Sequence, residues 1–245
     1  MESRAAPDLA QTYAAAIDWW REAGVDMDFA NAPAPWLAEP ESKAAAPARK
    51  VERKVVAPVI PEKPQIGGDP ATWPTTLDEF AAWWLAEPTL SPAGNRVPPR
   101  GTVNADLMVI VPMPELGDSD TLLSGPHGKL VGNMLRAMGV APEAAYLASA
   151  LPAHLPHADW AALKADGMDA VLAHHITLAA PKRLLVLGND ILPLLGLEKR
   201  QGVRDLPLSD SGLQLLSSFA PDNLLANAKA RAALWRRWLE WTEKT

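Results

Sequence analysis

The stretch LMVIV at residues 107–111 is followed at once by PMPELGDSD at residues 112–120. A run of apolar residues that includes valine and isoleucine predicts a strand that is buried on both faces of a sheet. An open α/β sheet binds its ligands at the carboxyl ends of such strands. The loop therefore lies where an active site is expected, although Pro112, Met113 and Pro114 are poor reagents for catalysis.

The same pattern of apolar runs and amphipathic helices continues through the rest of the chain. Further strands are predicted at residues 145–151, 183–187 and 213–219, and helices at residues 77–86, 128–138, 159–179 and 222–241. This alternation predicts a three-layer α/β/α fold with a four-stranded, mainly parallel sheet. We assign this domain to residues 74–245.

The residues before this domain have a different composition. Residues 1–30 contain a predicted helix that begins near Asp8 and ends near Gly24, because aspartate caps helix starts and glycine ends helices. Residues 31–73 are rich in proline, alanine and lysine. Such a segment buries too little apolar surface to order itself, so we expect a disordered linker.

The predicted N-terminal helix carries apolar residues at helical spacing. The candidate contact residues are Tyr13, Ile17, Trp19 and Trp20. This stripe either packs on the protein's own core or binds a protein partner. The long linker behind the helix is the argument for a partner, which we take as the expected one.

Amino-acid composition limits the kinds of functional site that the chain can carry. The chain has 245 residues, a formal net charge of −6 and no cysteine. The absence of cysteine excludes disulfides, thiolate nucleophiles, cysteine-bound zinc and iron–sulfur clusters. The histidines show no metal-binding spacing, so neither a metal nor another cofactor is expected. DNA remains a candidate partner only through a local basic patch, for which the candidates are Arg100, Lys129, Arg136, Lys199, Arg200 and Arg204.

Two signals for membranes and export are missing from the sequence. No apolar run approaches the roughly 18 residues that a membrane helix needs. The N-terminal residues MESRAAPDLAQ carry acidic side chains and no hydrophobic signal core. We therefore expect a soluble, cytoplasmic protein that does not bind membranes.

Four further segments carry a family likeness. They are SGPHGKL at residues 124–130, YLAS at 146–149, APKRLLVLG at 180–188 and FAPDNLL at 219–225. In this order, after the strand and its proline-rich loop, they resemble the uracil-DNA glycosylase superfamily. The likeness covers about residues 104–241 and is greatest to the bacterial branch that normally carries a four-iron cluster.

The resemblance implies a pocket for a flipped base, and this chain departs from the family's motifs at each part of that pocket. The glycine-rich first motif of the family corresponds here to Pro112, Met113, Pro114 and Glu115. The stacking phenylalanine corresponds to Leu123, the base-reading asparagine to Ser149, and the histidine that stabilises the leaving base to Ala220. Losing such an anion-stabilising donor costs about a hundredfold in rate.

These departures favour a catalytically degenerate member of the superfamily over an enzyme. The resemblance implies a binding or scaffold role in DNA replication or repair. The psi subunit of the bacterial clamp loader is similar, because it has such a fold without glycosylase chemistry. The alternative is an active DNA glycosylase that excises uracil or another deaminated base.

Several polar residues are candidates for the remaining functions. His127, Asp118 and Asp120 are the candidate catalytic residues, and surface or turn roles are the competing interpretations. The candidate phosphate-binding or DNA-binding residues are Gly125, Gly128, Lys129, Asn189 and Asn223. Glycine amides at a helix start bind phosphate, but tight-turn geometry explains such glycines equally well.

Overall fold

The computed structural model describes residues 9–23, 65–91, 94–206 and 212–243. The chain divides into two compact units, residues 1–59 and residues 60–245, and each is described by itself. In the first unit the described element is the helix α1 (Leu9–Glu22). Its predicted end residues, Asp8 and Gly24, and residues 31–64 of the expected linker lie outside the described residues.

The second unit is built on a five-stranded sheet with the order β2-β1-β3-β5-β4. The strands are β1 (Leu107–Val111), β2 (Ala145–Ser149), β3 (Leu184–Leu187), β4 (Gly202–Asp205) and β5 (Gln214–Ser218). All neighbouring pairs are parallel except β4 and β5, which are antiparallel. The predicted α/β class with a mainly parallel sheet is confirmed, but the predicted number of four strands is wrong.

The strand that the sequence did not reveal is β4. Its four residues, GVRD, alternate between partly exposed and exposed positions and form no apolar run. A short strand at the edge of a sheet is covered on fewer sides than a central strand, so its sequence need not be apolar. The periodicity that identified the other four strands is therefore absent from β4.

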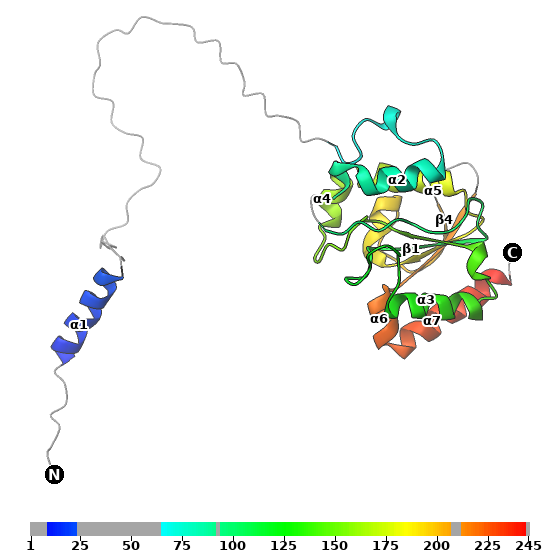
Figure 1. Cartoon of the computed structure of the whole chain (residues 1–245). Helices are drawn as coiled ribbons and strands as arrows, with labels where there is room; N and C mark the ends of the chain where they lie inside the picture. Colours follow the sequence, from blue (N-terminus) through cyan, green and yellow to red (C-terminus); the bar gives the residue numbers. More distant parts are fainter. Residues whose placement is uncertain (1–8, 24–64, 92–93, 207–211, 244–245) are drawn as a thin grey trace, which may run out of the picture. The chain divides into compact units, whose positions relative to one another are not determined.

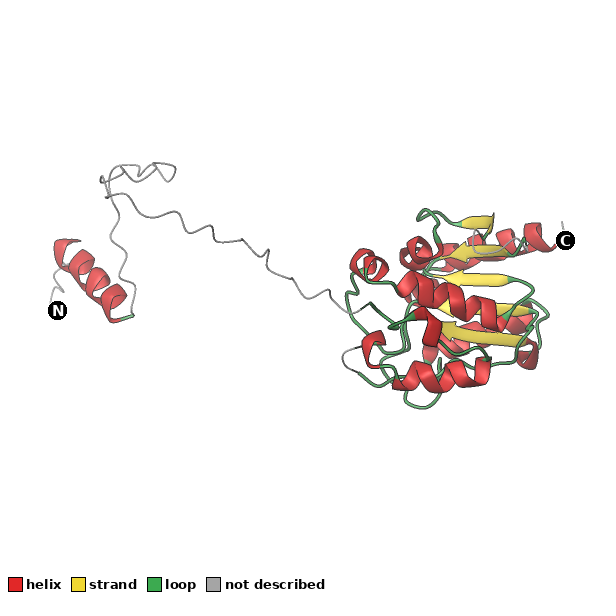
Figure 2. Ribbon diagram, turned by 90° about the horizontal axis from the view of Figure 1, so that it is seen from above, coloured by secondary structure: helices red, strands yellow, loops and turns green. Residues whose placement is uncertain are grey.

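Helices cover both faces of the sheet, which gives the expected three layers (Figures 1 and 2). One layer contains α2 (Leu77–Ala86), α4 (Trp160–Ala165) and α5 (Met168–Ala179), and the other contains α3 (Pro126–Ala137), α6 (Pro221–Ala226) and α7 (Ala228–Thr242). Short 3₁₀ turns form η1 (Pro70–Thr72), η2 (Pro88–Leu90), η3 (Pro142–Ala144) and η4 (Asn189–Leu195). Along β1, Met108 and Ile110 face the first layer, and the alternate residues face the second.

Two helices that were predicted as continuous are each interrupted. Gly167 has a φ of 105° and separates α4 from α5. Asn227 separates α6 from α7, and its side chain accepts hydrogen bonds from the amides of Lys229 and Ala230. The apolar spacing runs on across both breaks, so periodicity alone did not show them.

The domain begins earlier than the predicted residue 74. Ile66 is buried and belongs to the core on the α2 side of the sheet. The Trp73 indole Nε1 donates a hydrogen bond to the carbonyl of Gly67 over 2.7 Å, and its ring packs against the same core. Residues 65–73, which composition alone places in the linker, therefore pack as part of the domain.

A histidine lies at the centre of this core. His175 has no exposed surface, stacks on Phe80 with ring centroids 4.2 Å apart, and forms a 2.8 Å hydrogen bond with the Tyr146 hydroxyl. Burial, together with the nearby charge of His174, lowers the pKa of His175 to about 3. Burial also raises the pKa of Tyr146. Both side chains are therefore neutral near pH 7.

Within the described residues, no helix has the length and apolar character to cross a membrane.

Candidate functional site at the carboxyl edge of the sheet

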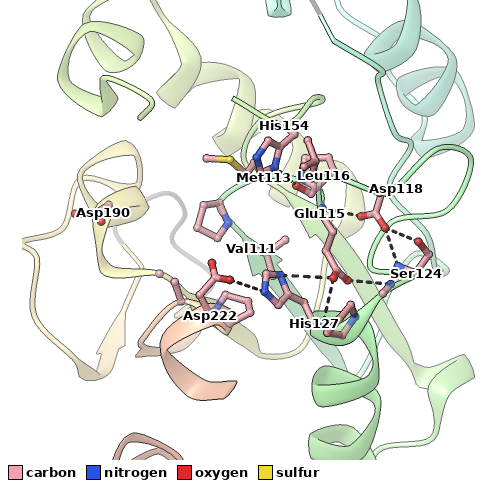
Figure 3. A pocket seen from close by; sticks show the side chains of 18 of the residues that line it. Val111, Met113, Glu115, Leu116, Asp118, Ser124, His127, His154, Asp190 and Asp222 are labelled. Atoms are coloured by element: carbon pink, nitrogen blue, oxygen red, sulfur yellow. Dashed lines mark hydrogen bonds and ion pairs between the residues drawn. The ribbon is translucent and has the colours of Figure 1, made fainter. Parts of the chain in front are cut away.

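A pocket of about 580 Å³ opens beside the carboxyl ends of β1 and β3 (Figure 3). From β1 the chain passes to β2 on one side and then returns to β3 on the other side of β1, so the strand order reverses here. Such switch points are the usual ligand sites of open α/β sheets. The pocket is lined by residues 111–118, 124–127, 188 and 220–222, together with His154, Trp160 and Asp190.

The carboxylate of Glu115 accepts hydrogen bonds from the backbone amides at the start of α3. It accepts hydrogen bonds from the backbone amides of Gly125 and His127, each over 3.1 Å, and of Gly128 over 3.0 Å (Figure 3). The N-terminus of a helix attracts anions because its amides are unpaired and its dipole is positive there. In this protein the anion at that position is a side chain of the same chain.

Close approach of these groups explains both glycines of the SGPHG segment. A Cβ atom added at Gly125 would lie 2.6 Å from Oε2 of Glu115. A Cβ added at Gly128 would lie 1.7 Å from the carbonyl oxygen of Leu123, which no side chain can accommodate. The glycines predicted to bind phosphate thus have a structural requirement, and their amides are held by Glu115.

Asp118 braces the loop between β1 and α3. It is 5% exposed and accepts hydrogen bonds from the amides of Glu115, Leu123 and Ser124 and from the Ser124 hydroxyl. Burial alone would raise the pKa of Asp118, but these hydrogen bonds outweigh it, so the pKa is lowered. Asp118 lines the pocket, and both of its carboxylate oxygens accept hydrogen bonds from the loop.

His127 lies between two carboxylates. Its Nε2 is 2.8 Å from Oδ1 of Asp222, and its Nδ1 is 3.9 Å from Oε2 of Glu115 (Figure 3). The contact with Asp222 joins residues that are 95 positions apart in the sequence. Asp222 was not predicted as a site residue. The available signal was its place just after Pro221, where the chain leaves β5 at the carboxyl edge.

Two further residues of the wall were also missed as site residues. His154 donates from Nδ1 to the carbonyl of Pro114 over 2.9 Å, which fixes the position of its ring at the pocket. Trp160, the first residue of α4, supplies an aromatic surface. Both residues follow β2 in the sequence. Because ligand sites form at the carboxyl ends of parallel strands, the segment after β2 was a predictable part of the site.

The structure brings together only part of the predicted set. Pro112, Met113, Pro114, Glu115, Asp118, Gly125, His127 and Ala220 line the pocket. Asp120, Leu123, Gly128, Lys129, Ser149, Asn189 and Asn223 are not among the lining residues. Ser149 is buried and its hydroxyl donates to the carbonyl of Leu151, so it does not face a ligand.

Pro112 is held close to β3 by a third glycine. Gly188 has a φ of 144°, and a Cβ there would lie 2.7 Å from Cγ of Pro112. The ring of Pro112 therefore occupies space that a side chain at residue 188 would need. This packing adds to the apolar character of the pocket floor.

The charged side chains that line the pocket are acidic. They are Glu115, Asp118, Asp190 and Asp222, and no lysine or arginine is among the described lining residues. Lys199 contacts this set from outside, through a 2.9 Å ion pair with Asp190. The pocket therefore disfavours phosphate and other anions. In the described ranges, no cluster of three or more histidine, aspartate or glutamate side chains is arranged to hold a metal ion.

The other candidate site is α1. Its four predicted contact residues include Tyr13, which is 70% exposed, Trp19, which is 62% exposed, and Trp20, which is 52% exposed. The two tryptophan rings meet edge to face with centroids 5.2 Å apart. No side chain of α1 is buried. The helix thus presents aromatic surface of the kind that anchors protein interfaces.

A scan against models of known protein families finds no match to this chain, and a search of curated proteins finds none either.

Proposed function

We propose that the protein is a non-catalytic binding or scaffold protein in DNA replication or repair, with a core resembling a uracil-DNA glycosylase. Its N-terminal helix α1 binds a protein partner. The observation that carries the loss of catalysis is Glu115, whose carboxylate takes the three amides at the start of α3. Donors aimed at developing negative charge stabilise a leaving base, and these three donors are already bound to a carboxylate.

The chemistry of the pocket supports this proposal. A leaving base with negative charge would meet the carboxylates of Glu115 and Asp222 in place of hydrogen-bond donors. At the position of the donor histidine, the family resemblance places Ala220, whose methyl group donates nothing. Electrostatic stabilisation is usually the largest catalytic contribution, so its reversal removes most of the rate enhancement.

Partner binding through α1 rests on its amphipathic sequence. Leu9, Tyr13 and Trp20 recur at helical spacing, whereas Gln11, Asp18 and Glu22 lie on the opposite side. An apolar helical face of this type docks into a groove on a partner.

The matched test uses the full-length chain with one added glutamate at either face of α1. Trp20→Glu places the charge on the apolar face, and Gln11→Glu places it on the polar face. In affinity capture from cells, we expect wild type and Gln11→Glu to recover the same replication or repair proteins and Trp20→Glu to lose them. Equal recovery by all three forms would exclude α1 as the binding element.

The second candidate function is an active DNA glycosylase, and the contact between His127 and Asp222 favours it. A histidine held by a carboxylate at a pocket can take part in acid–base chemistry. The test is release of free base from DNA that contains uracil, hypoxanthine or xanthine. Release that His127→Ala abolishes would establish the enzyme and overturn the proposed loss of catalysis.

A further inference from the structure

A second surface of the domain has the form of a receptor for a helix. Between α3 and α7 lies an apolar groove of about 410 Å³. Leu130 and Met134 line it from α3, Met138 lines it directly after the end of α3, and Leu234 and Trp235 line it from α7. The groove is separate from the pocket at the carboxyl edge, and none of its lining residues belongs to that pocket.

Large apolar side chains of α7 are in contact with solvent, one in the wall of the groove and one a helical turn further along. Trp235 is 38% exposed and Leu239 is 44% exposed. They are one helical turn apart on α7, so they lie on the same side of the helix. By contrast, Trp238 and Trp241 of the same helix are buried against the sheet. Exposed aromatic and aliphatic groups beside an apolar groove mark an interaction surface.

The two helices that form the groove are strongly basic, although the chain as a whole is acidic. Together they carry the cations Lys129, Arg136, Lys229, Arg231, Arg236 and Arg237 and the single acid Glu240. The net charge of the whole chain is −6. Arg231 lines the groove itself, and Lys129 and Arg136 are one turn from the lining residue Asn133 on α3.

We infer that the α3–α7 groove binds an acidic amphipathic helix of a partner protein. The floor of leucine and methionine side chains accepts the apolar ridge of a helix, and methionine adapts to ridges of different shape. Arg231 in its wall, and Lys129 and Arg136 beside it, attract carboxylates next to that ridge. Nucleic acid would leave most of the aliphatic floor without a matching surface, since only Trp235 offers a ring for base stacking.

This inference does not depend on α1 or on the loss of catalysis. It gives the domain a binding surface of its own and states the chemistry of what it binds. A protein that engages partners at two surfaces gains affinity when both are occupied at once.

The test begins with selection of helical peptides from a random displayed library on the full-length protein. We expect the enriched peptides to share apolar residues at positions i, i+3 or i+4, and i+7, and an excess of aspartate and glutamate. Enrichment of basic peptides, or of peptides without helical spacing, would overturn the inference.

Variants then locate the binding site of an enriched peptide. Trp235 is partly exposed, so a glutamate at this position is compatible with folding. Trp235→Glu is expected to weaken binding by more than about tenfold. Lys129→Glu combined with Arg136→Glu should weaken it about tenfold and reduce its salt dependence. The matched control is Leu85→Glu, a 41% exposed apolar residue on α2 in the opposite layer, which should leave binding unchanged. Unfolding curves establish that each variant is folded.

Other occupants give distinct results. Affinity of the full chain for single-stranded DNA that Trp235→Glu abolishes and Leu85→Glu preserves would identify a nucleic-acid surface. Self-association in sedimentation that Trp235→Glu abolishes would identify the groove as an interface between copies of this chain. Equal peptide binding by wild type and Trp235→Glu would place the peptide elsewhere. Each of these three results overturns the inference.

Discussion

Glu115 shows how one side chain changes what the edge of a parallel sheet can bind. The amides of Gly125, His127 and Gly128 converge on a point where many proteins of this class hold a phosphate or an oxyanion. Because the carboxylate is covalently part of the chain, its local concentration is higher than that of any free anion. Glu115 therefore competes with any free anion for these three amides.

Removing this carboxylate should expose the anion site. In Glu115→Ala, three amides lose their acceptor, and we expect the free energy of unfolding to fall by about 1–3 kcal/mol. Inorganic phosphate should then raise the melting temperature of the variant more than that of wild type. Sodium chloride at the same ionic strength is the control for general screening. An equal response of both proteins to phosphate would show that the amides do not form an anion site.

His175 couples the stability of the domain to acid. Its pKa is lowered to about 3 in the fold, from an ordinary value of 6.5. Between pH 6.5 and about pH 3, His175 therefore binds a proton in the unfolded chain but not in the folded chain. Its contribution to stability is complete above pH 6.5 and is lost as the pH falls from 6.5 towards 3.

We expect urea unfolding of wild type to show this loss between pH 6.5 and pH 4, with a slope approaching 1.4 kcal/mol per pH unit from this residue. His175→Leu should be less stable at pH 7, because it loses the Tyr146 hydrogen bond, but its stability should depend less on pH in this range. His157→Leu, at an exposed loop position, should keep the wild-type slope. A His175→Leu slope equal to that of wild type would exclude His175 as the acid-sensitive group.

At the scale of elements, glycines have opposite roles in the helices of the two layers. Gly132 lies inside α3, and an added Cβ would meet nothing within 4 Å. Gly167 separates α4 from α5 with a φ of 105°. The first position can take any helix-forming residue, whereas the second requires a backbone conformation that side chains rarely adopt.

The two alanine variants should therefore change stability in opposite directions. Gly132→Ala should raise the free energy of unfolding by about 0.5–1 kcal/mol, because alanine favours the helix. Gly167→Ala should lower it by about 1–3 kcal/mol, through strain at positive φ. Both are measured by urea unfolding at pH 7. A stabilising Gly167→Ala would show that α4 and α5 can join as the one helix expected from the sequence.

The apolar runs predicted β1, β2, β3 and β5, because helices bury these strands on both faces of the sheet. They missed β4, whose residues are exposed in alternation. The start of α2 was also predictable, because threonine is a favoured N-cap residue. In the structure Thr76 accepts a hydrogen bond from the amide of Glu79. Local chemistry is readable from the sequence where an element is long, apolar or capped, and not where it is short and exposed.

At the scale of the whole molecule, the position of the pocket was predictable and its contents were not. Parallel strands place their following loops together, so the segment after β1 had to lie at the candidate site. The contact of Glu115 with Gly128 and that of His127 with Asp222 depend on how the loops fold over the sheet. No local pattern encodes these contacts.

The acidic pocket leads to a prediction about DNA. Asp222→Asn keeps an acceptor for His127 but removes a negative charge from the pocket. If the domain binds DNA, its affinity at low salt should therefore rise about twofold or remain unchanged. The matched control is Asp205→Asn, which makes the same change of charge. Asp205 is the last residue of β4 and pairs with Gln214, the first residue of β5, so it lies at the edge of the sheet opposite the pocket. Fluorescence anisotropy with a uracil-containing duplex measures both. A marked loss of affinity in Asp222→Asn would show that Asp222 assists DNA binding.

The strand order has a consequence for association between molecules through the edges of the sheet. The two outer strands are β2 and β4, and unpaired outer strands invite neighbouring molecules to extend the sheet. Beside β2, Arg100 and Leu147 exchange backbone hydrogen bonds of 2.9 Å and 2.7 Å, which engages part of that edge. β4 is only four residues long and carries Arg204 and Asp205. One edge is partly covered and the other is short and charged, so the sheet resists growth into intermolecular aggregates.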